Sequence, residues 1–304
     1  MATLYALNVG RGDSFFVEIP TEKKSYVILL DGGNVFFDES VTPLGFMRKK
    51  GWSCVDLLIL THIHPDHLIG LLDVAKHATV KEAVLPYPIF SLHLGAMHRP
   101  KALQTAEMLQ KYEQLWSDLQ EQNTRIFVRS PFGAKSVWRF GELLLRHLDP
   151  VDKNHLSAYK IVERLSASTA EEQEHLCEIF DAQSNGDSSV WLLEHQNGAH
   201  LFLFGADALL PNWERITKRE QLHPHGFKVP HHGVTDAWNE HLLQLLSPDW
   251  LLITNDANEY EIYHEKWEQL AKSSGSRLFV TGSQSDTQHY LSRLPQLPER
   301  IEIK

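Results

Sequence analysis

Short runs of apolar residues alternate along this chain with longer stretches of helical period. The short runs, bounded by turn residues, predict strands near 3–9, 14–19, 25–31, 55–60, 80–85, 125–129, 137–148, 189–195, 200–205, 250–254 and 277–281. The Asn197-Gly198 turn between two of these runs predicts a hairpin. Apolar positions three or four residues apart, with helix start and stop signals, predict helices at about 68–77, 101–122, 155–181 (with a break near Ser166–Ser168), 236–246 and 264–274.

A dense group of polar residues follows the predicted strand at 55–60. The segment Thr61-His62-Ile63-His64-Pro65-Asp66-His67 places three imidazoles and a carboxylate on the loop that leaves this strand, where open α/β folds place their chemistry. The grouping predicts a metal site. Because His62 and His64 can turn toward one ion while Asp66 and His67 face a second about 3.5–4 Å away, the spacing favours two ions. A surface histidine cluster is the alternative, but this spacing is rare by chance.

Four more landmarks occur in order along the chain. They are the glycine-rich turn Val9-Gly10-Arg11-Gly12-Asp13, the strand end Leu30-Asp31-Gly32-Gly33, and two downstream segments, Phe204-Gly205-Ala206-Asp207 and Lys228-Val229-Pro230-His231-His232-Gly233. With the first motif, they resemble the metallo-β-lactamase superfamily, and within it the metallo-β-lactamase-like domain of ComEC-type DNA-uptake proteins. The resemblance spans most of the chain.

This resemblance implies an α/β fold, the metallo-β-lactamase αββα sandwich of two mixed β-sheets flanked by helices. It also implies two divalent metal ions. Asp207 would bridge them, because a shared carboxylate keeps two like-charged ions close together. One imidazole of the His231-His232 pair would complete the second site, while the other would contact substrate oxygens or orient the first. The expected metal ligands are therefore His62, His64, Asp66, His67, Asp207, His231 and His232, with catalytic roles for Asp66 and His232.

Other polar residues are expected to support this site. Asp31 is expected to hold the metal-loop backbone through hydrogen bonds, and Asp13 to be a structural carboxylate of the glycine-rich turn. Lys228 either contacts a non-bridging phosphoryl oxygen or lies on the surface. By position, His147 and His195 are candidates for a third ligand of the first site, but both are interpreted as packed or surface histidines.

Two positions depart from the family pattern. Ala206 stands just before the bridging aspartate, where glycine is usual, so this loop is less free to adopt a positive φ. His64 stands where ComEC-type domains often carry aspartate. The first metal shell is therefore richer in nitrogen, which favours zinc and leaves manganese possible.

Length and composition favour one domain. The chain has 304 residues with 42% apolar content, enough for a sizeable core. We expect a single domain over 1–304, with a helical insertion at about 86–185. Within it, 85–100 is either a lid or an ordinary connector. Cys54 and Cys177 have no CxxC spacing, which argues against a disulfide scaffold. No basic leader or long apolar run is visible, so we expect a cytoplasmic protein with no membrane partner.

The net charge is −10, from 39 acidic and 29 basic side chains. This disfavours a broad phosphate-tracking groove and favours a short phosphoester substrate, although two bound dications would supply about +4 at the site itself.

The expected function is a dinuclear metal-dependent hydrolase, a phosphodiesterase or nuclease that acts on a nucleic acid or nucleotide through a metal-bridging hydroxide. Hydrolysis of a carbonyl ester, lactone or thioester and a non-catalytic metal-binding module are the alternatives. The segment near Asn255 and His264 resembles the end of ComEC-type domains loosely, and His264 is interpreted as a helix-start residue.

Overall fold

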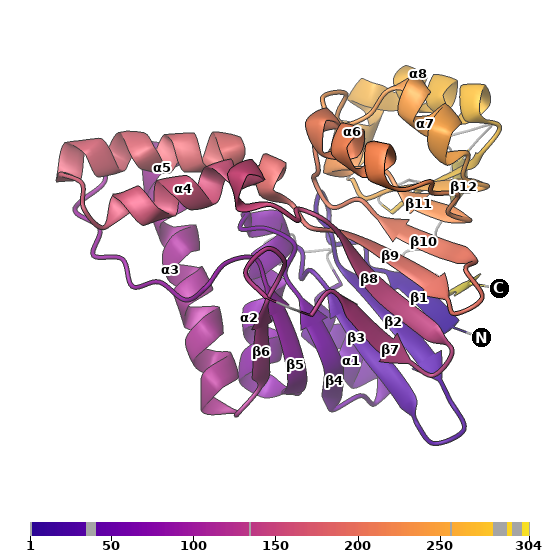
Figure 1. Cartoon of the computed structure of the whole chain (residues 1–304), viewed down its shortest axis with the longest axis horizontal. Coiled ribbons are helices and arrows are strands. Elements are labelled where there is room, and N and C mark those ends of the chain that lie inside the picture. Colours follow the sequence, from indigo (N-terminus) through magenta and orange to yellow (C-terminus); the bar gives the residue numbers. More distant parts are fainter. Residues whose placement is uncertain are drawn as a thin grey trace.

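Two mixed β-sheets pack face to face, with helices on both outer faces (Figure 1). The computed structural model describes residues 2–34, 41–133, 135–255, 257–281, 291–293 and 300–303. The side chain of His264 lies outside the described part. The architecture confirms the predicted αββα sandwich.

The first sheet has the strand order β15-β1-β2-β3-β4-β5-β6. Its strands β1, β2 and β3 pair antiparallel, β15 pairs antiparallel with β1, and β3 to β6 run parallel. The bounds are β1 (Ala2–Ala6), β2 (Phe15–Pro20), β3 (Ser25–Leu30), β4 (Cys54–Ile59), β5 (Thr79–Leu85), β6 (Arg125–Val128) and β15 (Arg300–Ile303).

The second sheet has the order β14-β13-β12-β11-β10-β9-β8-β7. Strands β7 to β10 pair antiparallel, whereas β10 to β14 run parallel. The bounds are β7 (Val137–Phe140), β8 (Leu143–Asp149), β9 (Val190–His195), β10 (His200–Phe204), β11 (Gly226–Lys228), β12 (Trp250–Ile253), β13 (Arg277–Val280) and β14 (Leu291–Arg293).

Three apolar layers hold the sandwich together. Residues such as Trp191, Phe202 and Trp250 fill the space between the sheets. A second cluster joins the first sheet to α1 (Pro43–Lys50), α2 (Pro65–His77), α3 (Pro100–Glu121), α4 (Ser157–Leu165) and α5 (Ala170–Ser184). A third joins the second sheet to α6 (Leu210–Arg219), α7 (Glu240–Leu246) and α8 (Ala257–Ser274). Short 3-10 turns lie at η1 (Lys153–His155), η2 (Asn185–Asp187) and η3 (His231–Gly233).

Several elements differ from the sequence prediction. The run at 137–148 is a hairpin, because Gly141 turns the chain with φ +62°. The helical stretch at 155–181 breaks where expected, and Thr169 starts α5 with a capping box to Glu172. Strands β11, β14 and β15 were not predicted; each has only three or four residues, too few for a clear period. Helices α1 and α6 were also missed, although Thr42 caps α1 just before Pro43, a recognisable start signal.

The interval 86–185 holds more than a helical insertion. It contributes β6 to the first sheet and β7 and β8 to the second. Its helices α4 and α5 extend beyond the sheets above α3 (Figure 1). The predicted insertion therefore corresponds to α3, α4 and α5, while the strands between them complete the sandwich.

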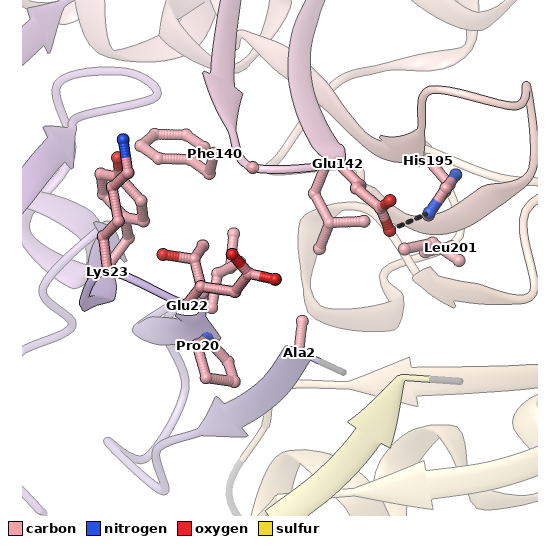
Figure 2. A pocket seen from close by; sticks show the side chains of 13 residues that line it. Ala2, Pro20, Glu22, Lys23, Phe140, Glu142, His195 and Leu201 are labelled. Carbon is pink, nitrogen blue, oxygen red and sulfur yellow. Dashed lines mark hydrogen bonds and ion pairs between the residues drawn. The ribbon is translucent and has the colours of Figure 1, made fainter.

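A cavity of about 950 Å³ opens at the edge of the sandwich where β2 turns into β3 and β7 into β8. Figure 2 shows Phe140 and Leu201 in its wall and His195 joined to Glu142 at its rim. Its lining shares no residue with the predicted metal ligands. The loops that carry those ligands leave the opposite ends of the strands.

Candidate metal centre

The predicted ligands follow the carboxyl ends of β4 in the first sheet and of β10 and β11 in the second. His62 and His64 follow β4, while Asp66 and His67 lie in the first turn of α2. Asp207 follows β10 and His232 lies in η3 just after β11, which pairs parallel with β10. Because the carboxyl ends of parallel strands share one edge, loops distant in sequence converge there.

Two groups of donor atoms form around one shared carboxylate. His62, His64 and Asp207 make the first group, and Asp66, His67, Asp207 and His232 make the second. Within each group the donor atoms lie within 4.8 Å of one another. Asp207 is therefore placed to bridge two cations, as two-metal sites require.

The distances are short enough for shared coordination. Asp207 Oδ1 lies 3.4 Å from His67 Nε2, and Asp207 Oδ2 lies 3.2 Å from His232 Nε2. His232 Nε2 is also 3.2 Å from Asp66 Oδ2. In the first group His62 Nε2 lies 3.1 Å from His64 Nδ1 and 3.9 Å from Asp207 Oδ2.

Two buried nitrogens indicate that this arrangement suits cations. The rings of His67 and His232 are fully buried, and Nε2 of each has no hydrogen-bond partner. A buried polar atom without a partner is unfavourable, and here both atoms face carboxylate oxygens. Imidazole nitrogens and carboxylate oxygens are the donors that Zn²⁺ and related cations prefer. The residues therefore fit the predicted pair of divalent ions.

Asp31 has the supporting role predicted for it. Its Oδ1 accepts from the Thr61 backbone N–H at 2.8 Å, and its Oδ2 accepts from Thr61 Oγ1 at 2.7 Å and from His67 Nδ1 at 2.9 Å. Because His67 donates through Nδ1, its Nε2 lone pair is free to face the second group.

Asp13 does more than stabilise its own turn. Its Oδ1 accepts from Thr254 Oγ1 at 2.6 Å, and Thr254 Oγ1 lies 3.0 Å from His232 Nδ1. Since the threonine hydroxyl donates to Asp13, its oxygen accepts from Nδ1–H of His232. This relay fixes the tautomer whose Nε2 faces Asp66 and Asp207. Thr254 was missed in the sequence, because nothing local marks it as a partner of the N-terminal turn.

Lys228 does not lie on the surface, which was one of the two interpretations offered for it. Its side chain is fully buried, and Nζ donates to the Ala206 carbonyl oxygen at 2.7 Å. Nζ also lies 2.7 Å from Asp13 Oδ2 and 3.4 Å from Asp207 Oδ1. Lys228 is therefore an internal cation that holds two carboxylates and the loop before the bridging residue.

Carboxylates outnumber fixed cations at the site and shift its pKa values. Burial favours a neutral His67, but Asp207 and Asp31 outweigh it and raise its pKa well above the ordinary value. Asp207 likewise overcomes burial and raises the pKa of His232 to about 10. Burial and the neighbouring His67 lower the pKa of His62. The second group thus attracts positive charge, which bound dications would supply in place of protons.

The glycine-rich turns support the metal loop through its backbone. Asp13 N–H donates to the Asp66 carbonyl at 3.0 Å, and Gly32 N–H donates to the His67 carbonyl at 2.7 Å. A Cβ on Gly12 would lie 2.6 Å from the Asp66 carbonyl oxygen. Such a close approach excludes any side chain at position 12.

Backbone strain gathers in the same loops. Asp31, Ala206, His231 and His232 all have φ between 45° and 56°, a region that residues other than glycine rarely occupy. Ala206 adopts the positive φ despite its Cβ. The Lys228 hydrogen bond to its carbonyl helps to hold that conformation.

His231, unlike His232, does not join either group of donors. Its Nδ1 lies 2.8 Å from Asp236 Oδ1, and its Nε2 lies 3.1 Å from Asn185 Nδ2. The positive φ of both histidines turns consecutive rings in different directions. His232 points inward, whereas His231 contacts η2 at the end of α5.

The other two candidate histidines join neither group of donors. His147 is buried, packs 5.0 Å from the ring of Trp191, and burial lowers its pKa to about 3. His195 contacts Glu142 at 3.3 Å on the rim of the large cavity (Figure 2). Their interpretation as packed and surface residues is confirmed.

Helices α3 and α5 also contribute contacts around the metal loop. His64 Nε2 lies 3.3 Å from the Asp181 carbonyl oxygen near the end of α5, and Asp181 Oδ2 pairs with Lys101 Nζ at 2.7 Å. His64 can donate through Nε2 and keep Nδ1 for the first group. This contact gave no signal in the sequence, since Asp181 lies inside an unremarkable amphipathic helix.

The sheets, the helix layers and the site at one edge define a metallo-β-lactamase fold. Residues 8–130 match the model of the metallo-beta-lactamase superfamily. A curated relative is "ComE operon protein 3" of Bacillus subtilis (strain 168), 23% identical over 297 residues. The match covers 93% of this chain but 32% of the relative, so this chain spans about a third of it.

Solved structures with low sequence identity also resemble the chain. A diphosphatase from the PhnP family has 10% identity and a TM-score of 0.46, covering 100% of this chain and 98% of that one. AidC, a dizinc quorum-quenching lactonase, has 12% identity and a TM-score of 0.36, covering 95% and 79%. No helix in the described residues is long and apolar enough to cross a membrane.

Proposed function

We propose that this chain is a dinuclear metal-dependent phosphodiesterase or nuclease. The observation that carries the proposal is Asp207, which belongs to both donor groups while unpartnered nitrogens of His67 and His232 face it. Two divalent cations held there would supply an activated water and polarise the phosphoryl oxygens of the substrate. The nitrogen-rich first group, His62 and His64 with Asp207, favours zinc over manganese.

Residues of the chain itself would accept a proton and hold the metal ligands in position. Asp66 lies partly open to solvent, and its pKa is lowered because the neighbouring His67 and His232 outweigh burial. It is therefore a carboxylate near neutral pH and can accept a proton from the attacking water. His232, held by Thr254, would stay oriented toward the second cation. Lys228 would keep Asp207 in place as charge redistributes.

Metal content and substrate turnover test the proposal together. The purified chain is analysed for bound metal and assayed on bis-p-nitrophenyl phosphate, single-stranded DNA, RNA and cyclic dinucleotides, with a lactone and a thioester as carbonyl substrates. We expect two metal ions per chain and turnover of a phosphodiester. The Asp66→Ala, His67→Ala double variant should lose at least about 10³-fold in activity. The control variant His195→Ala, far from the site, should keep its activity.

Three results would contradict the proposal. Exclusive turnover of lactone or thioester would identify a carbonyl hydrolase on the same site. Failure to bind metal, with no hydrolysis after zinc or manganese is added, would identify a non-catalytic module. Equal activity of the double variant and the wild type would show that the assigned site is wrong.

A further inference from the structure

A smaller pocket, of about 240 Å³, lies beside the large cavity and shares Tyr26 and Phe140 with it. It is built at the amino ends of β3 to β6 and closed by β7, so it lies at the opposite ends of the strands from the metal centre. We call it the basic pocket. Its cationic lining residues are Lys24, Lys81, Arg125, Lys135 and Arg139.

The charge of the basic pocket is opposite to that of the chain. Five cationic side chains face two carboxylates, Asp56 and Glu82, which leaves three positive charges uncompensated. The whole chain carries a net charge of −10. Such a local concentration of one sign attracts ions of the other sign.

Both carboxylates are already saturated. The ammonium groups of Lys24 and Lys81 share one oxygen, Asp56 Oδ1, at 2.6 and 2.7 Å, while Asp56 Oδ2 accepts from the Val27 backbone N–H at 3.0 Å. Two ammonium groups on a single oxygen are close enough to repel each other. An additional anion would relieve that repulsion.

Glu82 is saturated in the same way. Its Oε2 lies 3.1 Å from Lys135 Nζ and accepts from Trp138 Nε1 at 2.8 Å, while its Oε1 pairs with Arg125. Arg139 has no ion-pair partner among the described residues. The pocket therefore has more guanidinium and ammonium donors than its two carboxylates can accept from.

Aromatic rings hold the cations in position. Lys24 Nζ lies 3.9 Å from the centre of the Tyr26 ring, and Lys135 Nζ lies 4.6 Å from that of Trp138. Cation–π contacts of this kind restrict the long side chains, so less conformational entropy is lost when an anion binds.

We propose that the basic pocket binds phosphate oxyanions, either free or as phosphate groups of a nucleic acid. Ammonium and guanidinium groups form short, charge-assisted hydrogen bonds to phosphate. The pocket volume suits a compact anion, and the donors come from both sheets. This proposal does not depend on hydrolysis at the metal centre.

Binding is tested on the full chain after metal has been removed by chelation and dialysis. Inorganic pyrophosphate is titrated while the indole N–H resonance of Trp138 is followed by NMR, since this group donates to Glu82 at the pocket wall. We expect a saturable shift. The Lys81→Gln, Arg139→Gln variant removes two exposed cations and should bind about 10-fold or more weakly.

The control variant Lys49→Gln, Lys76→Gln removes the same charge from α1 and α2, outside the pocket. It should change the affinity by less than about 2-fold. His62→Ala should leave the titration unchanged, which separates this result from the fate of the proposed function. Circular dichroism confirms that each variant is folded.

Two oligonucleotides distinguish the sources of phosphate. A 5′-phosphorylated single strand that binds better than its unphosphorylated form identifies a terminal phosphate; equal, salt-sensitive binding identifies backbone phosphates. Binding of pyrophosphate alone identifies a free anion. The proposal is overturned if no probe causes a saturable shift, or if the pocket and control variants bind alike. The lysines would then only keep the edge strands β6 and β7 from pairing with other chains.

Discussion

Replacing Lys228 by methionine should destabilise the protein strongly, because it leaves a buried carboxylate without its counter-charge. At the 2.7 Å that separates Lys228 Nζ from Asp13 Oδ2, the attraction between unit charges is about 6 kcal/mol at an effective dielectric constant of 20. Desolvation of both groups offsets much of this, yet loss of one partner from a buried pair costs about 3–5 kcal/mol. We expect that loss in the free energy of unfolding.

The double variant Asp13→Asn, Lys228→Met separates charge from packing. An asparagine oxygen at position 13 can still accept from Thr254, and no unpaired charge remains at that position. We therefore expect the double variant to be more stable than Lys228→Met alone. The coupling energy of the cycle should be at least about 2 kcal/mol.

The assay is urea unfolding of metal-free protein at neutral pH, followed by tryptophan fluorescence and circular dichroism. Metal must be absent, since a ligand that binds only the folded state would add its own stabilisation. If the two single variants add without coupling, Lys228 does not act as the counter-charge of Asp13 in the interior. A loss below about 1 kcal/mol for Lys228→Met would show that Lys228 is solvated rather than buried.

Other features give further expectations. Since the pKa of His147 is lowered to about 3, the unfolded chain binds an extra proton below about pH 6.5, and stability falls by up to about 1.4 kcal/mol per pH unit toward pH 3. His147→Phe should remove this component of acid sensitivity in unfolding curves recorded from pH 7 to 4; an unchanged slope would refute it. Gly70→Ala would place Cβ 2.0 Å from the Gly32 carbonyl oxygen, so the melting temperature and metal content should both fall. Gly186→Ala, with open space around its Cβ, serves as the control. Asp31→Asn should weaken metal affinity about 10–100-fold in chelator competition, and affinity equal to that of the wild type would contradict its supporting role.

Local signals in the chain account for much of the candidate site. Residues 62–67 can be recognised without a structure because ligands on one short loop must be close to one another whatever the rest of the fold does. The supporting role of Asp31 follows from its place at the end of a strand, beside the strand that leads into the metal loop. The predicted strands fail mainly where an element is very short, as in β11, or where glycine folds one apolar run into the β7–β8 hairpin.

Consecutive residues can have opposite roles that composition does not reveal. His231 and His232 are chemically identical, yet one ring contacts Asp236 and the other faces Asp207. Asn185 likewise gives no local signal in the sequence, because its contact with His231, a residue distant along the chain, is visible only in the structure. Such assignments depend on torsion angles that the surrounding packing imposes.

By itself, the sequence determined the αββα class, the edge that carries the chemistry and the composition of the metal loop. The metal loop and its edge depend on spacing over a few residues after an apolar strand, which is a local property, whereas the αββα class follows from the resemblance of the motifs to a known family. The tertiary structure alone decided that Lys228 lies inside, that Thr254 connects Asp13 to His232, and that cations gather in the basic pocket. Each of these requires strands from distant parts of the chain to meet, and burial and charge pairing arise only once they have packed together.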